Sequence, residues 1–535
     1  MKNKFFRIIL FVLTISLLTT ACTKSRQQDD GDLIVQTENN NVLNLGMDSV
    51  DTLNPILSKS VSVRECMQLI FEPLFSFDDA FNPIGVLAES CVASPDFKSY
   101  TIKLKSGILW HDNSELTAKD VEHTINLIRY NESYYSSSLS QIANVICVDE
   151  YTLVLKLSRP VPNFTALLSF PIVQQEATTE IVNYIPVGTG PYKYDDKVSS
   201  DKIKLVPNKS WRGNIATIDM IYLNVLKDNQ SLINAYNANS VSVITSGVMD
   251  LRKNTPRGGN NINDYISNNL VFLGINNSRS EFAGSNTRQA LSFLVDRDDI
   301  ITTEIFSRAV PVKIPVNPSA WYYPKDIAEE NGMDYIKELL ALDGWYPDET
   351  GRFVRNGESM ADDSDGAAAS QEVLTANIIV NSGNDERLRI AKKIAASFSD
   401  FGIKTSVTEV SFEDYKLMID EKNYSMFIGE VNLPYNMDVK SLLVDEDNYF
   451  AFYSEEMNDA IYQLGVCQST EDEKLAFSNF SNRFLVSTPF VPLFFRKESV
   501  IFEKSVSGTS TPTMFSAFRE PENWYISKIK NKTEQ

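Results

Sequence analysis

The residue with the clearest chemical role is Cys22, which directly follows the apolar stretch FFRIILFVLTISLLTTA. Basic residues near the start, a short apolar run and small residues before a cysteine are typical of a signal peptide, here residues 1–21. The thiol of a first mature cysteine can carry a diacylglycerol, and its amine can carry an acyl group. We therefore expect an exported protein anchored to the outer face of the cytoplasmic membrane through lipidated Cys22, with residues 22–41 as a flexible tether.

Two alternatives to this lipid anchor stay open. Cys22 could be incidental in an ordinary secreted protein. A transmembrane anchor is the weaker alternative, because the apolar run from Phe5 to Leu18 is shorter than the ~20 residues that span a bilayer.

Other residue types with catalytic or metal-binding potential are sparse. The sequence has two histidines, His111 and His123, and contains no GxSxG elbow, HExxH helix or Walker motif. We therefore expect no enzyme activity, no cofactor and no metal site, and an ATPase would have to be a separate chain. A hydrolase that uses paired carboxylates stays an alternative only because Asp and Glu are abundant.

The four cysteines after Cys22 are Cys66, Cys91, Cys147 and Cys467, and none of them forms a CxxC pair. We expect them to be small buried apolar residues. A bridge among the first three stays open, because disulfides persist outside the cytoplasm.

The charge balance excludes one class of partner. The formal net charge of −20 becomes −23 when Lys2, Lys4 and Arg7 leave with residues 1–21. Nucleic-acid binding needs a basic face, so we expect no nucleic-acid partner.

A chain of 535 residues predicts roughly two to four domains of ~150 residues each.

Strands and helices alternate along the first half. We expect strands at 42–47, YTIKLKSG, YTLVLKLS, IDMIYLNVL and VSVITSG. Residues 62–75 have helical spacing, LTAKDVEHTINLIRY predicts a helix with a capping box at Thr117 and Asp120, and 229–237 predicts a further helix.

The second half alternates more regularly. Strands at 374–382, 403–410 and 424–431 enclose helices at 385–401 and 412–421, which predicts parallel strands with right-handed crossovers. We also expect a strand at 270–276, one amphipathic helix over NTRQALSFLVDRDDII, an acidic surface loop at 356–371, and a strand at 488–502 that returns to the first lobe. Two lobes crossed more than once by the chain predict a cleft with hinges at the crossings.

Several segments between about residues 42 and 530 carry a family resemblance: DTLNPILS, IFEPLF, AESCVASPDFKSYTIKLKSGILWHDNSELTAKDVEHTI, VGTGPYKY, NTRQALSFLVDRDDII, IKELLALDGW and VPLFFRKESVIF. In order and spacing they resemble the extracellular solute-binding proteins of bacterial ABC importers, family 5, the dipeptide- and oligopeptide-binding branch. The resemblance implies a monomeric binding protein that captures peptides and delivers them to a permease and an ATPase.

The resemblance also implies the fold, an α/β, two-lobed periplasmic-binding-protein-like fold of class II. It would be of the large peptide-binding type, with an extra inserted domain and a ligand cleft between the lobes. Domain I would be discontinuous and comprise 42–54, 186–272 and 491–530. Domain II would be inserted at 55–185, and domain III would span 273–490.

A protein that takes many peptides must bind what they share, which is the backbone, the α-ammonium and the α-carboxylate. Three regions match family segments that run beside the ligand. They are the loop of Lys59, Ser60 and Val61, the pair Tyr134 and Tyr135, and Tyr415 with the run Gly429, Glu430, Val431 and Asn432. Simpler interpretations stay open, with the tyrosine pair on the surface and Tyr415 in the core.

The run GEVNLPYNMD departs from the family pattern GW.aDY.dP. Aligned on Gly429, the family's ammonium-binding Asp falls on Leu433 and its Trp falls on Glu430. Glu430 or Asp438 could supply the missing counter-charge. Otherwise the ligand has no free α-amine or is not a peptide, which leaves a nickel chelate, haem or an oligosaccharide as alternatives. Independently, a peptide-sensing surface receptor that signals rather than transports stays an alternative.

Two further motifs are expected to be structural. Trp110 and His111 belong to the longest resembling segment, where the hairpin chiefly supports the fold. Gly188, Gly190 and Pro191 are expected to serve backbone geometry.

Overall fold

A computed structural model describes residues 41–175, 184–245, 260–325, 327, 332–356 and 371–527. The predictions for Cys22, for the signal peptide and for nearly all of the tether and the acidic loop lie outside these residues. Within the described ranges, no helix has the length and apolar character needed to cross a membrane.

The largest sheet of the described residues has eleven strands in the order β18-β17-β19-β12-β20-β11-β1-β10-β9-β8, with β13 paired to β20. Their bounds are β1 Val42–Met47, β8 Tyr192–Ser199, β9 Lys202–Pro207, β10 Met220–Val225, β11 Val243–Thr245, β12 Asn260–Ile275, β13 Ala309–Pro311, β17 Thr375–Asn381, β18 Lys404–Val410, β19 Met426–Asn432 and β20 Phe490–Glu503.

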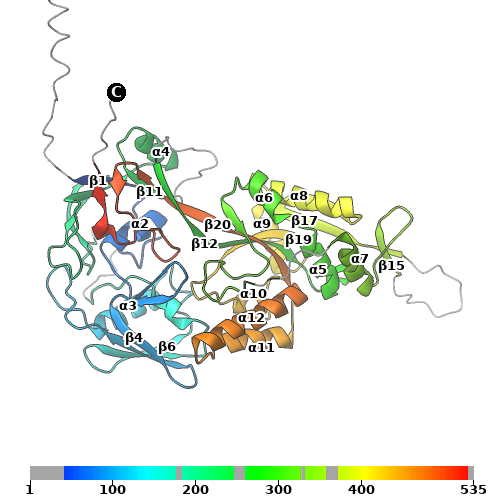
Figure 1. Cartoon of the computed structure of the whole chain (residues 1–535), viewed down its shortest axis with the longest axis horizontal. Helices are drawn as coiled ribbons and strands as arrows, with labels where there is room; N and C mark the ends of the chain where they lie inside the picture. The colour runs from blue at the N-terminus through cyan, green and yellow to red at the C-terminus, as the bar shows by residue number, and fades with distance from the viewer. Residues whose placement is uncertain are drawn as a thin grey trace, which may run out of the picture. The chain divides into compact units, whose positions relative to one another are not determined.

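The long strands β12 and β20 connect the two halves of this sheet (Figure 1). They pair with each other from Asn260↔Glu503 to Gly274↔Phe490, with an irregularity between Ile266 and Leu270. At one end β12 also pairs with β19, and at the other end β20 also pairs with β11. The predicted strand 270–276 is therefore only the last part of β12. The polar first part of β12, residues 260–269, forms a strand because it pairs with β20 and not because it has an apolar face.

A four-stranded antiparallel sheet, β4-β5-β7-β6, lies in the first part of the chain. Helix α3 (Ala118–Tyr130) begins at the predicted capping box, where the Thr117 N–H donates to the Asp120 carboxylate at 2.8 Å. The strands are β4 Ala88–Ala93, β5 Ser99–Leu104, β6 Ile142–Cys147 and β7 Thr152–Leu157. β5 alternates between buried and exposed residues, which confirms the strand with one wet face.

The segment 62–75 is only partly helical. Helix α2 (Val61–Cys66) starts at Ser60, whose hydroxyl accepts from the Val63 N–H, and a 3₁₀ turn follows at Met67–Leu69. The helical turns end at Leu69, and Pro73 disfavours helical geometry at the residue before it, so no further helix forms before β2 (Phe75–Phe77), which pairs with β3 (Pro83–Gly85).

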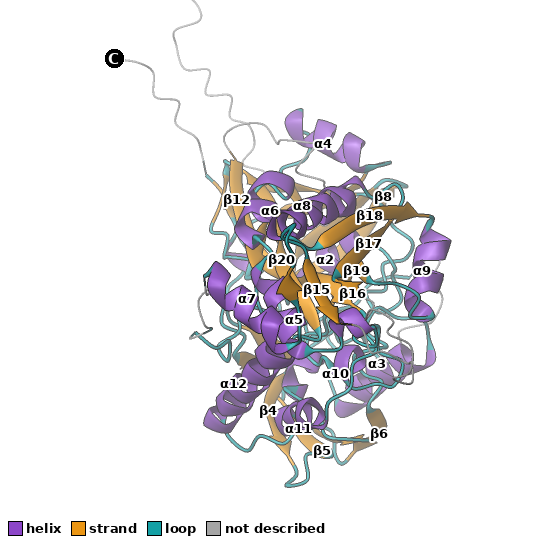
Figure 2. Ribbon diagram, turned by 90° about the vertical axis from the view of Figure 1, so that its right-hand side faces the viewer, coloured by secondary structure: helices purple, strands orange, loops and turns teal. Residues whose placement is uncertain are grey.

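The β-α-β-α-β prediction for the second half is confirmed. β17 pairs in parallel with both β18 and β19. The first crossover runs from β17 to β18, and the second runs back past β17 to β19. Right-handed connections in opposite directions place their helices on opposite faces, and Figure 2 shows α8 (Asp385–Phe401) and α9 (Phe412–Asp420) on the two sides of these strands.

The single helix predicted over NTRQALSFLVDRDDII is instead two, α5 (Ser285–Phe293) and α6 (Arg297–Glu304). Asp296 is extended and caps α6 by accepting from the Asp299 N–H. Arg297 is buried and donates to the carbonyl oxygens of Val312 and Pro492. These tertiary contacts interrupt a pattern that is continuous in the sequence.

The remaining elements complete the described chain. They are α4 Asn229–Asn237, α7 Met333–Leu342, β14 Tyr346–Pro347, β15 Phe353–Asn356, β16 Gln371–Val373, α10 Lys440–Leu443, α11 Glu455–Leu464, α12 Thr470–Ser487, β21 Val506–Ser507, β22 Tyr525–Ile526, and 3₁₀ turns at Phe164–Leu168, Ser280–Phe282 and Pro521–Asn523.

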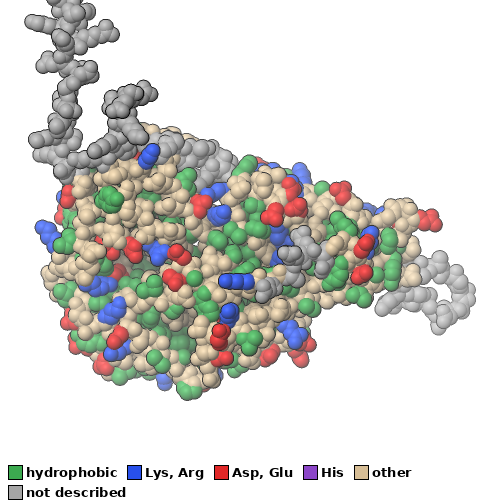
Figure 3. Space-filling model, viewed as in Figure 1, with side chains coloured by type: hydrophobic (Ala, Val, Ile, Leu, Met, Phe, Trp, Pro, Cys, Tyr) green, Lys and Arg blue, Asp and Glu red, His purple; other side chains and the backbone are tan. Residues whose placement is uncertain are grey.

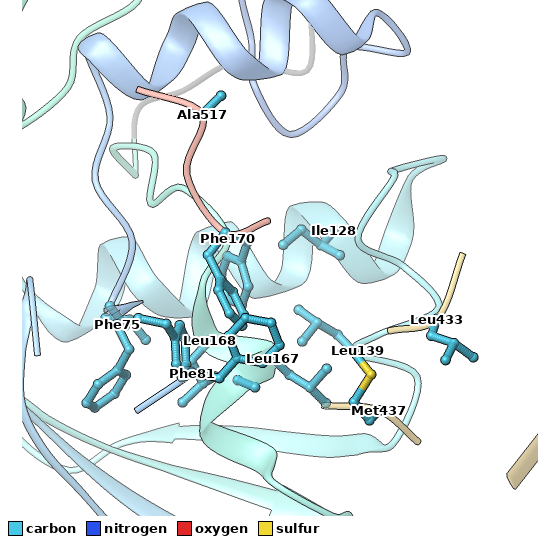
Figure 4. Packing of buried hydrophobic residues seen from close by; sticks show 14 of the residues in the cluster. Phe75, Phe81, Ile128, Leu139, Leu167, Leu168, Phe170, Leu433, Met437 and Ala517 are labelled. Atoms are coloured by element: carbon cyan, nitrogen blue, oxygen red, sulfur yellow. The ribbon is translucent and has the colours of Figure 1, made fainter. Parts of the chain in front are cut away.

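The largest buried cluster reaches from the first part of the chain to the loop after β19. Figure 4 shows Met437 of that loop beside Leu139, with Leu167 and Phe170 near them. Leu433 belongs to the same cluster, so the position where the family carries its ammonium-binding Asp is here an apolar contact.

Surface charge is mixed, and of the four cysteines expected to be buried only Cys66 is fully so. On the face in Figure 3, basic and acidic side chains are interspersed, with no continuous basic area. Cys66 is buried, and Cys91, Cys147 and Cys467 are half-buried. All four are free thiols, so the disulfide that the sequence left open is absent among these described cysteines.

Candidate ligand-binding cleft

Two adjoining cavities lie between α2, the segment after α3, and the loop that follows β19. The large chamber, of about 650 Å³, is lined mainly by residues 134–141, 159–167 and 431–445. The small chamber, of about 310 Å³, is lined by α2, β12, β20 and residues 514–517. Both chambers are lined by Tyr134, Tyr135, Asn432 and Tyr435, so they form one continuous cleft.

The loop after β19 is held in place from two sides. The Leu433 N–H donates to the carbonyl oxygen of Asn268 at 3.0 Å, and the Asn268 amide donates to the Leu433 carbonyl at 3.1 Å. On the other side, the Asn436 amide donates to the Pro162 carbonyl at 2.8 Å. The irregular part of β12 and the segment near residue 160 together fix this wall of the cleft.

Tyrosines form the wall that the chambers share. The Asn432 amide donates to the Tyr134 hydroxyl at 3.0 Å, and the Arg64 guanidinium lies 4.1 Å from the centre of the Tyr134 ring. Burial raises the pKa of Tyr135 and of Tyr435 far above the usual value, so both phenols stay neutral. This wall therefore offers aromatic faces and neutral hydroxyls.

Charges in the large chamber are paired with each other. Arg159 and Asp438 approach to 2.9 Å, and Lys440 and Asp445 approach to 3.5 Å. The remaining polar lining consists of hydroxyls and amides, from Ser137, Ser138, Ser140, Gln141, Asn432, Asn436 and Ser441. The large chamber can therefore make many neutral hydrogen bonds without demanding a charge of either sign.

The small chamber is acidic. Glu498 of β20 accepts from the Tyr265 hydroxyl at 2.8 Å and from the Asn269 amide at 3.2 Å. Glu65 of α2 accepts from the Thr245 hydroxyl at 2.6 Å. Burial raises the pKa of both carboxyls, and that of Glu65 reaches about 7.

Five of the predicted site residues line the cleft: Val61, Tyr134, Tyr135, Val431 and Asn432. Two others lie just before Val61. The Ser60 side chain caps α2. Lys59 is exposed and forms an ion pair with Glu132 at 2.7 Å.

The other three predicted residues, Gly429, Glu430 and Tyr415, are not among the lining residues of either chamber. Gly429 lies opposite Phe272, where a Cβ atom would come within 2.4 Å of the ring. Glu430 accepts from the Arg496 guanidinium at 2.6 Å. Tyr415 is buried and donates to the Ile428 carbonyl at 2.6 Å. The structure thus favours a packing role for Tyr415 and an ion-pair role for Glu430.

The motifs around His111 and Gly188, which were expected to be structural, make contacts within the fold. The Nε2 atom of His111 lies 3.0 Å from the carbonyl oxygen of Gly190, and burial lowers the pKa of His111 to about 4. The backbone of Gly188 runs against that of Ile70, leaving no space for a side chain. Close packing, rather than a positive φ, is therefore the reason for this glycine.

Sequence reasoning missed the residues that give the cleft its charge. These are Arg64, Glu65, Arg159, Lys440, Asp445 and Glu498. One signal was available, because the charged run RKE at 496–498 interrupts an otherwise apolar strand. Among the described residues, no group of three His, Cys, Asp or Glu side chains could hold a metal ion.

Comparisons with known proteins give a consistent result. A family model described as bacterial extracellular solute-binding proteins, family 5 Middle, matches residues 82–444. Oligopeptide-binding protein AppA of Bacillus subtilis (strain 168) is 22% identical over 559 residues, which cover 97% of this chain and 98% of that protein. Heme-binding protein A of Haemophilus influenzae is 22% identical over 397 residues, or 68% of each chain.

A solved structure shows the same fold. The unliganded open form of the MppA periplasmic murein tripeptide binding protein matches with a TM-score of 0.76 and 16% sequence identity. The match covers 91% of this chain and 98% of that one. The predicted two-lobed α/β binding-protein fold is thereby confirmed.

Solute-binding proteins of ABC transporters are exported proteins and are not enzymes, in agreement with the sequence analysis. The family model matches more than half of the chain, and the Bacillus subtilis relative aligns with nearly the whole chain. The chain therefore belongs to the bacterial extracellular solute-binding proteins of family 5.

Proposed function

We propose that this protein captures peptides in the cleft and delivers them to the permease and ATPase of an ABC importer. In this proposal it works as a monomer on the outer face of the cytoplasmic membrane, anchored through lipidated Cys22. The observation that carries the proposal is the lining of the large chamber, where charges are mutually paired and the remaining polar groups are amides and hydroxyls.

Such a lining suits a ligand recognised by its backbone. Every peptide unit carries one N–H donor and one C=O acceptor, which neutral amides and hydroxyls can satisfy whatever the side chains are. The volume of the large chamber lies within the range of ~300–1,000 Å³ typical of ligand pockets. Val61, Tyr134, Tyr135, Val431 and Asn432 both line the cleft and belong to segments that resemble ligand-flanking segments of the family, and we propose these five as contact residues.

We further propose that the lobes close about β12 and β20. This proposal keeps the domain boundaries predicted from the sequence. They are domain I at 42–54, 186–272 and 491–530, domain II at 55–185, and domain III at 273–490. Three contacts join residues of the second and third domains: Arg159–Asp438, Tyr134–Asn432 and Asn436–Pro162. Opening would separate these contacts, while the irregularity between Ile266 and Leu270 could absorb the bending.

Native mass spectrometry tests the proposed cargo. Residues 23–535, purified without denaturation and then denatured, should release a ladder of short peptide masses, because a backbone-reading cleft accepts many sequences. The same protein refolded from denaturant without ligand serves as the control and should release none. A single non-peptide mass, or an empty protein that a peptide library does not stabilise thermally, would overturn peptide capture in favour of another solute.

A further inference from the structure

The two chambers differ in how their charges are compensated. In the large chamber, Asp438 and Asp445 each have a cationic partner. In the small chamber, Glu65 and Glu498 form no ion pair with any Lys or Arg of the described chain, although both lie on its wall. Taking a carboxylate out of water without a counter-charge is unfavourable, so a cationic group in this chamber would stabilise both carboxylates.

The nearby arginines are already occupied. The Arg64 guanidinium stacks on the Tyr134 ring and donates to the Ser58 carbonyl at 3.3 Å. Arg496 is next but one to Glu498 in β20, yet it donates to Glu430 and Glu386. Alternate residues of a strand share a face, but here the guanidinium turns to the carboxylates of β19 and α8 instead.

Glu65 is the more deeply buried of the two carboxylates, at 8% exposure. Its Oε2 atom accepts the hydrogen bond from Thr245, while no described residue donates to Oε1. This oxygen is available to a ligand that enters the chamber.

Glu498 is held rigidly by two neutral donors. Tyr265 and Asn269, both of β12, fix its carboxylate by hydrogen bonds of 2.8 and 3.2 Å. Neutral donors orient a carboxylate without cancelling its charge, so Glu498 stays able to attract a cation.

We infer that the small chamber binds a cationic group of the ligand, an ammonium or a guanidinium, between Glu65 and Glu498. This subsite would supply the counter-charge that the loop after β19 lacks at Leu433, and it rests on the proposed function. An organic cation fits better than a metal ion, because the described residues hold no cluster of three metal ligands. An ammonium offers three donors to the acceptors on this wall.

Calorimetry with matched peptides tests the inference on the unmodified protein. Free tetra-alanine should bind about 10- to 100-fold more tightly than N-acetylated tetra-alanine, as expected for a charge-assisted hydrogen bond. An N-acetylated peptide with one lysine separates two sources of the cation. If it regains the affinity, the chamber takes a side-chain ammonium, and if it does not, the chamber takes the α-ammonium.

Glu65→Gln and Glu498→Gln should each remove most of that advantage and leave the acetylated peptide nearly unaffected. The matched control is Asp264→Asn, one residue before Tyr265 on β12, where the carboxylate pairs with Arg308 at 2.8 Å outside the lining of both chambers. If wild-type protein binds the free, the acetylated and the acetylated lysine-containing peptides equally well, the inference fails while peptide capture stands. If no peptide binds at all, the proposed function itself fails.

The pH dependence of binding provides a second readout. The pKa of Glu65 is about 7 against 4.5 in the unfolded chain, with Glu498, Arg64, Asp48 and Tyr265 as the charged or titratable groups facing it. The empty folded protein therefore keeps a proton that the unfolded chain loses between about pH 4.5 and 7, so its stability falls as pH rises through this window. A bound cation favours the ionised carboxylate and displaces this proton.

Affinity for the free-amine peptide should therefore rise from pH 5 to pH 7.5, by at most about tenfold per pH unit below the pKa. Calorimetry at pH 6 in buffers of different ionisation enthalpy should detect proton release. In Glu65→Gln both effects should shrink. An affinity that stays flat or falls over this range in the wild-type protein would contradict the inference.

Discussion

Replacing Gly188 by alanine is expected to destabilise the protein by about 3 kcal/mol or more. An added Cβ would come within 1.9 Å of the Ile70 carbonyl oxygen, a contact with backbone rather than with a movable side chain. The surroundings cannot yield easily. The Gly190 N–H donates to the same carbonyl at 2.8 Å, and the His111 N–H donates to the Gly188 carbonyl at 2.9 Å.

Urea unfolding of purified protein measures this effect, and loss of soluble protein would be its extreme form. Gly332→Ala is the matched control, because an added Cβ meets no atom within 4 Å there and the backbone has no positive φ. We expect the control to stay within about 1 kcal/mol of the wild type. A Gly188→Ala protein as stable as the control would show that the two backbones can move apart.

Replacing Arg496 by methionine is expected to lower the free energy of unfolding by about 3 kcal/mol. Its guanidinium donates to both Glu430 and Glu386. The Glu386 side chain is only 10% exposed, and methionine keeps most of the length but removes the charge. Arg387 would remain 4.0 Å from Glu430, but the buried Glu386 carboxylate would lose the Arg496 cation between it and Glu430, so charge repulsion and desolvation would disfavour the native state.

Arg352→Met is the control for this second variant. Arg352 pairs with Asp348 at 2.9 Å, but its side chain is 56% exposed, so we expect a loss below about 1 kcal/mol. Thermal or urea unfolding of both variants makes the comparison, and equal losses would mean that the Arg496 cluster contributes no more than a surface pair.

The Arg496 cluster also bears on the ammonium site that the sequence suggested. Glu430→Gln should change stability but leave affinity for a free-amine peptide within about twofold, because Glu430 already has its cation. A tenfold loss of affinity at unchanged stability would restore Glu430 as the clamp and contradict the assignment to Glu65 and Glu498.

Local patterns predicted the elements that depend on neighbouring residues. Helices over 229–237 and 385–401 appear with the predicted bounds, and the capping box at Thr117 and Asp120 forms. A helix or a half-buried strand repeats its contacts every few residues, so its signature is present in any short window of sequence.

Contacts between segments that are far apart in the sequence could not be predicted from such short windows. The first ten residues of β12 carry no strong strand pattern and form because β20 pairs with them. The break between α5 and α6 depends on carbonyls at Val312 and Pro492, which the Arg297 guanidinium reaches.

The sequence by itself determined that this protein is an exported solute-binding protein of family 5, because ordered motifs and β-α alternation persist along the chain. Only the tertiary structure decided which charges face the cleft. Glu430 and Val431 are adjacent, yet only Val431 lines a chamber, because the Glu430 carboxylate pairs with Arg496 instead. Glu65 of α2 and Glu498 of β20 are more than 400 residues apart in the sequence, and only the tertiary packing of α2 beside the sheet brings them to one wall.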